Sequence, residues 1–204
     1  MSLSRRMMLA IAAGSSLGTV AFAQGSAPAP TRVRGVIDTV GAHDIRVTTR
    51  SGEKLTLKLA DDVGVTMIEP IAIDAIKPGS FIGTAAVAQP DGSLKALEIQ
   101  VFPESMRGVG EGHRPWDLGA GSTMTNGTVG DLKVSNGRLL TLAYKGGEQK
   151  VYVPENAPII TYAPGSKADL KPGAHVIITA VHNADDTTTA TRIGVGKDGL
   201  VPPM

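Results

Sequence analysis

Two stretches of the chain are closely similar: residues 76–87, Ile-Lys-Pro-Gly-Ser-Phe-Ile-Gly-Thr-Ala-Ala-Val, and residues 170–181, Leu-Lys-Pro-Gly-Ala-His-Val-Ile-Ile-Thr-Ala-Val. When residues 61–101 are aligned with residues 155–195, a shift of 94 without a gap, ten of the 41 positions are identical. Upstream, Gly35-Val36-Ile37 matches Gly127-Thr128-Val129 with a shift of 92. Internal repetition of this length indicates two copies of one structural module.

Each copy has the residue pattern of short β-strands. Apolar and polar residues alternate in 45–48, 55–59, 140–142 and 151–153, so side chains two apart share one face of a sheet. Residue pairs that favour tight turns separate these runs: Ser51-Gly52, Asp91-Gly92, Asn136-Gly137, Gly146-Gly147 and Asp185-Asp186. The segment Ser166–Leu170 has the pattern of one capped helical turn before the second Lys-Pro-Gly. No longer helix is predicted.

The predicted fold is therefore all-β. We expect two tandem small OB-like β-barrel domains, one over residues 31–102 and the other over 125–196, because a small sheet hides its edges by closing on itself. A flat sandwich is the alternative. Between the two domains, residues 103–124 would form an ordered, glycine-rich connector, and residues 197–204 a C-terminal tail.

The beginning of the chain has the pattern of a cleavable signal peptide over residues 1–23. Arg5-Arg6 precedes a short apolar stretch, and Ala21-Phe22-Ala23 supplies the small residues that a signal peptidase recognises. Residues 4–9, Ser-Arg-Arg-Met-Met-Leu, also resemble a twin-arginine export signal, so both the Sec and the twin-arginine routes stay open. We expect a periplasmic or secreted protein with a flexible tether over residues 24–30.

The composition excludes several classes of function. The chain has no cysteine, which rules out disulfides and thiolate chemistry. Its 20 basic and 19 acidic residues are dispersed, and only seven residues are aromatic. Nucleic-acid binding needs concentrated basic residues and aromatic platforms, so it is not expected. After the leader, no apolar run is long enough for a membrane-spanning helix, so we do not expect an integral membrane protein.

The connector is the most distinctive segment, because it combines glycines with charged residues and the single tryptophan of the chain. Its candidate ligand-binding residues are Arg107, Glu111, His113, Arg114, Trp116 and Asp117. In a structural interpretation, Trp116, Met106 and Met124 pack between the two barrels. In a binding interpretation, the candidate residues line a cleft at the domain junction, a common place for ligands. In a metal or catalytic interpretation, His113 forms a nitrogen and carboxylate cluster with Glu104, Glu111 and Asp117.

The connector, over residues 102–117, has the pattern F-P-E-x-M-R-G-x-G-E-G-H-x-P-W-D. This string resembles one found in uncharacterised bacterial exported proteins with tandem small β-barrel domains of unknown function. The Leu/Ile-Lys-Pro-Gly turn resembles the same kind of tandem exported domain. The resemblance implies the tandem barrel architecture and export, and it carries no catalytic residues to transfer.

These observations favour a non-enzymatic envelope protein that binds another protein, a glycan or a small ligand. The first alternative is a periplasmic metal-binding protein that holds a divalent cation with His113, Glu111 and Asp117. The second alternative is a hydrolase that works through the same connector residues. No cofactor is predicted apart from the divalent metal of the first alternative.

Overall fold

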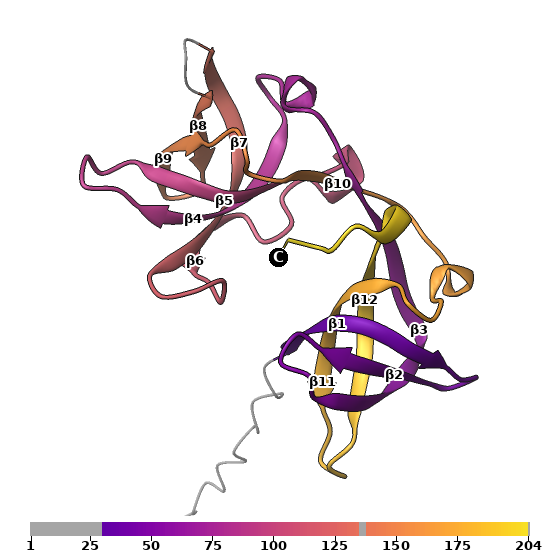
Figure 1. Ribbon diagram of the computed structural model, residues 1–204. Coiled ribbons are helices and arrows are strands. Elements are labelled where there is room, and N and C mark those ends of the chain that lie inside the picture. The colour runs from indigo at the N-terminus through magenta and orange to yellow at the C-terminus, as the bar shows by residue number, and fades with distance from the viewer. Residues whose placement is uncertain (1–29, 135–137, 204) are drawn as a thin grey trace, which may run out of the picture.

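The computed structural model describes residues 30–134 and 138–203. Within these residues the chain forms twelve β-strands and four single-turn 3₁₀ helices (Figure 1), so the all-β prediction is confirmed. The predicted signal peptide, residues 24–29 of the tether and the turn at Asn136-Gly137 lie outside the described residues.

The strands have these bounds: β1 (Thr31–Val40), β2 (Asp44–Thr49), β3 (Lys54–Pro70), β4 (Phe81–Ala88), β5 (Leu94–Val101), β6 (Gly112–Pro115), β7 (Ser122–Val134), β8 (Arg138–Tyr144), β9 (Gly147–Val153), β10 (Ile159–Pro164), β11 (His175–His182) and β12 (Thr188–Gly196). The helical turns are η1 (Ile73–Ala75), η2 (Glu104–Met106), η3 (Lys167–Asp169) and η4 (Lys197–Gly199). The capped turn predicted from the sequence is η3, in which the backbone N–H of Ser166 donates to the Asp169 carboxylate at 2.7 Å.

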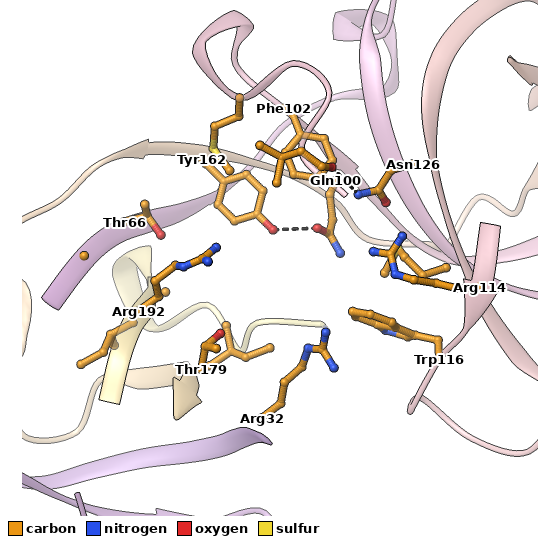
Figure 2. A pocket seen from close by; sticks show the side chains of 17 residues that line it. Arg32, Thr66, Gln100, Phe102, Arg114, Trp116, Asn126, Tyr162, Thr179 and Arg192 are labelled. Atoms are coloured by element: carbon orange, nitrogen blue, oxygen red, sulfur yellow. Dashed lines mark hydrogen bonds between the residues drawn. The ribbon is translucent and has the colours of Figure 1, made fainter. Parts of the chain in front are cut away.

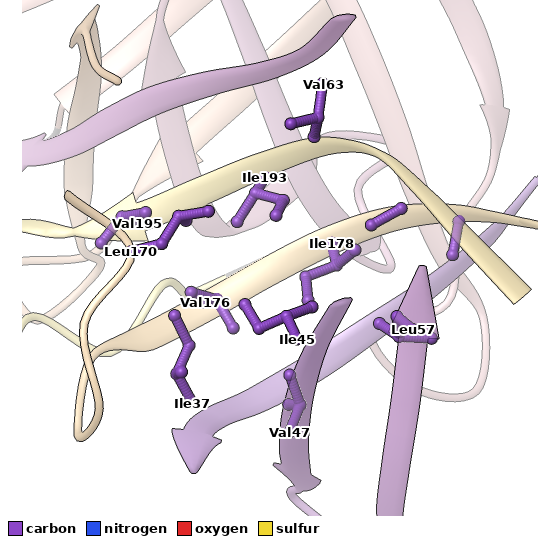
Figure 3. Packing of buried hydrophobic residues seen from close by; sticks show 12 residues of the cluster. Ile37, Ile45, Val47, Leu57, Val63, Leu170, Val176, Ile178, Ile193 and Val195 are labelled. Carbon is purple, nitrogen blue, oxygen red and sulfur yellow. The ribbon is translucent and has the colours of Figure 1, made fainter. Parts of the chain in front are cut away.

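Five strands from the two ends of the chain close into a β-barrel, which we call the terminal barrel. Around its circumference the order is β1, β2, β3, β12 and β11, with β11 pairing back to β1. All neighbours are antiparallel except β3 and β12. The barrel encloses a core of alternating inward side chains, which includes Ile37, Ile45, Val47, Leu57, Val176, Ile178 and Ile193 (Figure 3). Closure leaves these five strands without a free edge.

Five other strands, from the middle of the chain, pair in a second ring, which we call the central ring. Its order is β7, β8, β9, β5 and β4, with β4 pairing back to β7. Only β5 and β9 are parallel, and they are joined by two residue pairs. The ring encloses a separate apolar core, which includes Ile76, Ile82, Leu94, Ile99, Val129, Leu140, Leu142, Val151 and Val153.

The predicted division into a barrel of residues 31–102 and a barrel of residues 125–196 is wrong. Strands β4 and β5 do not return to β1–β3; they complete the central ring with β7–β9. Strands β11 and β12 complete the terminal barrel instead. The physical reason is that β3 continues for 17 residues, about 56 Å at ~3.3 Å per residue. This length carries the chain out of the terminal barrel before β4 begins.

Strands β3 and β10 connect the barrel to the ring. Where they cross, they pair with each other in an antiparallel arrangement. Ile68 lies opposite Tyr162, and Pro164 lies opposite Thr66. Ile68 and Tyr162 are 94 residues apart, the same shift that aligns the two copies in the sequence. Buried Ile68 and Ile160 pack with Leu200 at this crossing, so the predicted C-terminal tail contacts the same junction. The crossing places the terminal barrel beside the central ring and so positions the site described next.

Candidate functional site

The connector between β5 and β7 is a short hairpin. Strand β6 pairs with the beginning of β7, with Gly112 opposite Asn126. The turn before β6 needs a glycine at Gly110, where φ is +59° and a Cβ would lie 3.3 Å from the Arg114 guanidinium. The predicted connector, residues 103–124, therefore has a defined backbone, and its last three residues already belong to β7.

Strand alternation separates the connector residues that the sequence grouped together. Successive side chains of β6 point to opposite faces. On one face, His113 Nδ1 lies 2.8 Å from Thr125 Oγ1, and the His113 ring stacks on Tyr144. On the other face, Arg114 and the following Trp116 line a cavity. His113 is therefore not beside Trp116 in one cleft.

The cavity has a volume of about 280 Å³ and lies between the terminal barrel and the central ring (Figure 2). It is lined from the terminal barrel by Arg32, Gly64, Thr66, Ile177, Thr179, Arg192, Ile193 and Gly194, from the crossing by Tyr162, and from the central ring and connector by Gln100, Phe102, Met106, Val109, Arg114, Trp116, Met124 and Asn126. Met106, Trp116 and Met124 do lie at the junction, as the structural interpretation expected. Of the residues named in the binding interpretation, Arg114 and Trp116 border the open volume, whereas Glu111, His113 and Asp117 are not among its lining residues.

The Trp116 ring lies between two guanidinium groups. Arg32 Cζ is 3.9 Å from the ring centroid, and Arg114 Cζ is 5.4 Å from it. Figure 2 shows the guanidinium groups of Arg32 and Arg114 beside the indole of Trp116. Cations over an indole face are attracted by the negative face of its quadrupole, so Trp116 orients both arginines at the cavity wall.

Asp117 is the only connector carboxylate near this wall, and it is already paired. Arg34 donates to both of its oxygens, at 2.8 Å and 3.2 Å. Arg32 lies 3.8 Å away. These hydrogen bonds from Arg34, followed by the charges of Arg34 and Arg32, hold the pKa of Asp117 below its ordinary value. Asp117 thus ties β1 to the connector, and one carboxylate is shared by two arginines.

Arg192 contributes a third guanidinium from the opposite side of the cavity (Figure 2). Among the described residues its side chain has no hydrogen-bond or ion-pair partner. The pKa of Arg114 is lowered by burial and by the positive charge of Arg32. The cavity wall therefore carries an excess of positive charge that the surrounding carboxylates do not neutralise.

A chain of hydrogen bonds runs from the cavity to a buried carboxylate. The Tyr162 hydroxyl donates to Gln100 Oε1 at 2.7 Å, and Gln100 Nε2 donates to Glu98 Oε1 at 2.8 Å. Glu98 is 1% exposed. Burial raises its pKa to about 7, although the Gln100 hydrogen bond and the charges of Arg34 and Arg50 act in the opposite direction. Burial and the charge of Glu98 also raise the pKa of Tyr162, which keeps its hydroxyl a donor.

Buried side-chain polar atoms without a hydrogen-bond partner gather at this cavity. Within the described residues they are Glu98 Oε2, Trp116 Nε1 and Asn126 Oδ1. Trp116 and Asn126 line the cavity, and Glu98 is one hydrogen bond behind Gln100. Folded proteins satisfy nearly all such atoms, so each exception needs an explanation such as strain, a catalytic role, or a bound water or ion. Some polar groups here therefore have no hydrogen-bond partner within the described part of the fold.

The other predicted connector residues have local roles. Arg107 donates to the Glu104 carboxylate at 2.8 Å and to the Gly79 carbonyl at 2.9 Å. The Glu111 carboxylate accepts a hydrogen bond from the backbone N–H of Lys145 at 2.9 Å. Both contacts hold the connector against the central ring.

The predicted metal cluster of His113, Glu111 and Asp117 does not form. Within residues 30–134 and 138–203, no group of three or more His, Asp or Glu side chains has a geometry that could hold a metal ion. Alternation in β6 turns His113 away from the cavity wall, while Arg34 and Lys145 engage Asp117 and Glu111.

Several cavity residues were not predicted from the sequence: Arg32, Gln100, Asn126, Tyr162, Thr179 and Arg192. They come from β1, β5, β7, β10, β11 and β12. Arg32 and Arg34 alternate along β1 and so share a face, but this pattern is also that of an ordinary solvent-facing strand. No signal in the sequence connects these positions, because they meet only where the terminal barrel and the central ring come together.

The described residues contain no helix that has both the length and the apolar character to cross a membrane. No protein-family model matches the chain, and neither a curated protein nor a solved structure is significantly similar to it.

Proposed function

We propose that the protein is an exported, non-enzymatic binding protein that takes up a small ligand in the cavity between the terminal barrel and the central ring. The observation that carries this proposal is the gathering of partnerless polar atoms at one cavity, two of them on the lining residues Trp116 and Asn126. Ligand pockets are typically concave, mostly apolar and equipped with a few convergent polar groups. This cavity has that composition.

The chemistry of the lining favours binding over catalysis. The described lining residues include no histidine, carboxylate, serine, cysteine or lysine. The hydroxyl groups of the lining are those of Thr66, Thr179 and Tyr162, and no described lining residue is a histidine or carboxylate that could activate them for nucleophilic or general acid–base catalysis. Arginine and glutamine side chains orient and hold a ligand but exchange no proton with it near neutral pH. The proposed role is therefore capture.

Location and fold class support this role. The leader pattern of residues 1–23 favours a periplasmic or secreted protein. The five-stranded, mostly antiparallel terminal barrel supports the OB-like assignment, and barrels of this kind bind ligands on their surfaces. Junctions between domains are a preferred place for small-molecule sites.

The test compares two identical substitutions. Thr179→Phe places a ring into the cavity, whereas Thr56→Phe places the same ring on an exposed position of β3. Each protein is incubated with a small-molecule extract of the cell envelope. Its mass is then measured by native mass spectrometry. We expect an additional mass on the wild type and on Thr56→Phe, and none on Thr179→Phe. Far-UV circular dichroism checks that both variants are folded.

The proposal is overturned if the wild type carries no additional mass, or if folded Thr179→Phe carries the same mass as the wild type. The first result would mean that the cavity captures nothing from the envelope. The second would place the binding site elsewhere on the molecule.

A further inference from the structure

We propose that the ligand is a small amphipathic organic anion, with one carboxylate or phosphate group held by the arginines and an apolar body in the rest of the cavity. This inference rests on the proposed function and names its ligand class. It follows from the charge, the geometry, the apolar wall and the size of the cavity.

The charge of the wall selects an anion. Arg32, Arg114 and Arg192 all line the cavity, whereas no described lining residue is acidic. The guanidinium groups point toward the open centre of the cavity in Figure 2. The nearest carboxylate, Asp117, already receives two hydrogen bonds from Arg34. A ligand with negative charge would therefore supply the counter-charge that the protein does not.

The geometry of the donors fits a carboxylate or a phosphate. A guanidinium is a planar fork that donates two parallel hydrogen bonds to such groups. Trp116 holds Arg32 and Arg114 in fixed positions, so little side-chain entropy is lost when they bind a ligand. Arg192 lies across the cavity from Arg114 and has no partner of its own among the described residues.

The apolar wall selects a ligand that also has a hydrocarbon part. Phe102, Met106, Val109, Met124 and Ile177 line the same cavity. Val109 is 44% exposed, so its side chain is accessible to a ligand in the cavity. Methionine side chains adapt their shape to an apolar guest. An inorganic anion would leave this wall uncovered.

The size of the cavity and the state of its tryptophan argue against a larger ligand. A volume of about 280 Å³ is just below the ~300–1,000 Å³ that is usual for ligand pockets. Sugars and nucleobases bind by stacking on open aromatic faces, but Arg32 covers one face of Trp116 at 3.9 Å. A glycan or a nucleotide base would first have to displace that arginine.

The test uses Trp116 as the reporter, because it is the only tryptophan in the chain. Its fluorescence is followed while the protein is titrated with octanoate, octyl phosphate, octanol, acetate and octyltrimethylammonium. We expect octanoate and octyl phosphate to bind at least about tenfold more tightly than octanol, since a hydrogen bond to a charged group contributes ~1.5–3 kcal/mol. Acetate and the cationic surfactant should not reach saturation. Comparison of the two anions identifies the preferred headgroup.

A matched pair of variants tests the role of the arginines. Arg192→Gln removes a guanidinium that has no partner among the described residues, and Arg46→Gln removes an exposed one on β2, outside the cavity. We expect Arg192→Gln to weaken octanoate binding about tenfold and Arg46→Gln to leave it unchanged. Octanol binding should be the same in both variants.

Two outcomes overturn the ligand class. If octanol binds as tightly as octanoate and Arg192→Gln changes neither, the cavity binds neutral apolar ligands, and the proposed binding function stands without the anion. If no probe changes the fluorescence while the native mass experiment still shows a captured molecule, the class is again wrong and the function stands. If both experiments are negative, the binding function itself fails.

Discussion

The terminal barrel and the central ring have the same strand order and the same register, yet they differ in how their third strand is built. Gly35 pairs with Val176 in the barrel, and Gly127 pairs with Ile82 in the ring. Each pair joins the first strand of one half of the sequence repeat to the fourth strand of the other half. The third strand of the barrel, β3, is continuous over 17 residues. In the ring, the equivalent segment is divided into β9 and β10.

Two prolines account for this difference. Pro154 and Pro158 lie between β9 and β10, where a shift of 94 residues places Ala60 and Gly64 within β3. Proline has no backbone N–H to donate to a neighbouring strand. As a result β12 pairs with β3 along seven residues, whereas β5 pairs with β9 along two and with β10 along three. The two prolines thus lie where the strand is interrupted in the ring and continuous in the barrel.

A second difference concerns one pair of equivalent positions. Glu98 of β5 lies opposite Ala85, and Arg192 of β12 lies opposite Thr179, in matching registers. Glu98 is buried behind Gln100, whereas Arg192 faces the cavity. The same place in the fold therefore provides a buried carboxylate in one half and a guanidinium that faces the cavity in the other. The proposed site depends on the halves being similar in backbone and different in side chain.

The largest expected effect comes from the two cores. Ile99 and Ile193 occupy equivalent positions and are each at most 1% exposed. We expect Ile99→Ala and Ile193→Ala each to lower the free energy of unfolding by about 2–5 kcal/mol. Because strands are exchanged between the barrel and the ring, both variants should still unfold in one transition. Urea denaturation followed by Trp116 fluorescence and by circular dichroism measures this.

The control for the core variants is Val201→Ala, since Val201 is 50% exposed, and we expect a change within about 0.5 kcal/mol. Two separated transitions in either core variant would contradict the comparison, because they would show that the barrel and the ring unfold independently.

The next effect concerns pH and Glu98. Its pKa is raised by burial from 4.5 to about 7 in the folded chain, so between these values the folded chain binds more protons than the unfolded chain. The free energy of unfolding should therefore decrease as the pH rises from 4.5 to 7, by up to about 3 kcal/mol. Glu98→Gln should abolish this slope and be more stable than the wild type at pH 8.

Urea denaturation at a series of pH values measures the slope. Glu148→Gln, at an exposed position of β9, serves as the control and should keep the slope of the wild type. An equal slope in Glu98→Gln and the wild type would show that another group is responsible.

The smallest effect tests whether the two Lys-Pro-Gly turns are equivalent. Gly79 and Gly173 both have φ of +86°, and nothing lies within 4 Å of a Cβ at either position. Alanine at either one should therefore cost only the strain of the left-handed backbone, about 1–2 kcal/mol. We expect the same loss in thermal denaturation for both variants, and no loss for Gly130→Ala, which has an ordinary φ. Unequal losses of stability would mean that one of the two glycines has a further structural role.

Part of the candidate site could be predicted from residue types. Arg114 and Trp116 were predicted as binding residues, and both line the cavity; an isolated tryptophan among glycines and charges in a connector is an unusual combination. His113 and Glu111 belonged to the same prediction, but β6 alternates, and they lie elsewhere. Arg32 and Arg192 could not be predicted, because their sequence neighbours resemble those of any exposed strand.

The sequence by itself determined the all-β class, the positions of several strands and turns, the capped turn before Lys171 and a shaped connector. These features depend on interactions between residues close in the chain: alternation along a strand, positive φ at a glycine, and capping of a turn. Only the tertiary structure decided which strands complete which ring. Strands β4 and β11 follow similar turns and have similar apolar patterns, so local forces are satisfied equally well by either partner. The choice depends on where β3 and β10 carry the chain, and that same choice brings Arg32, Arg192 and Trp116 around one cavity.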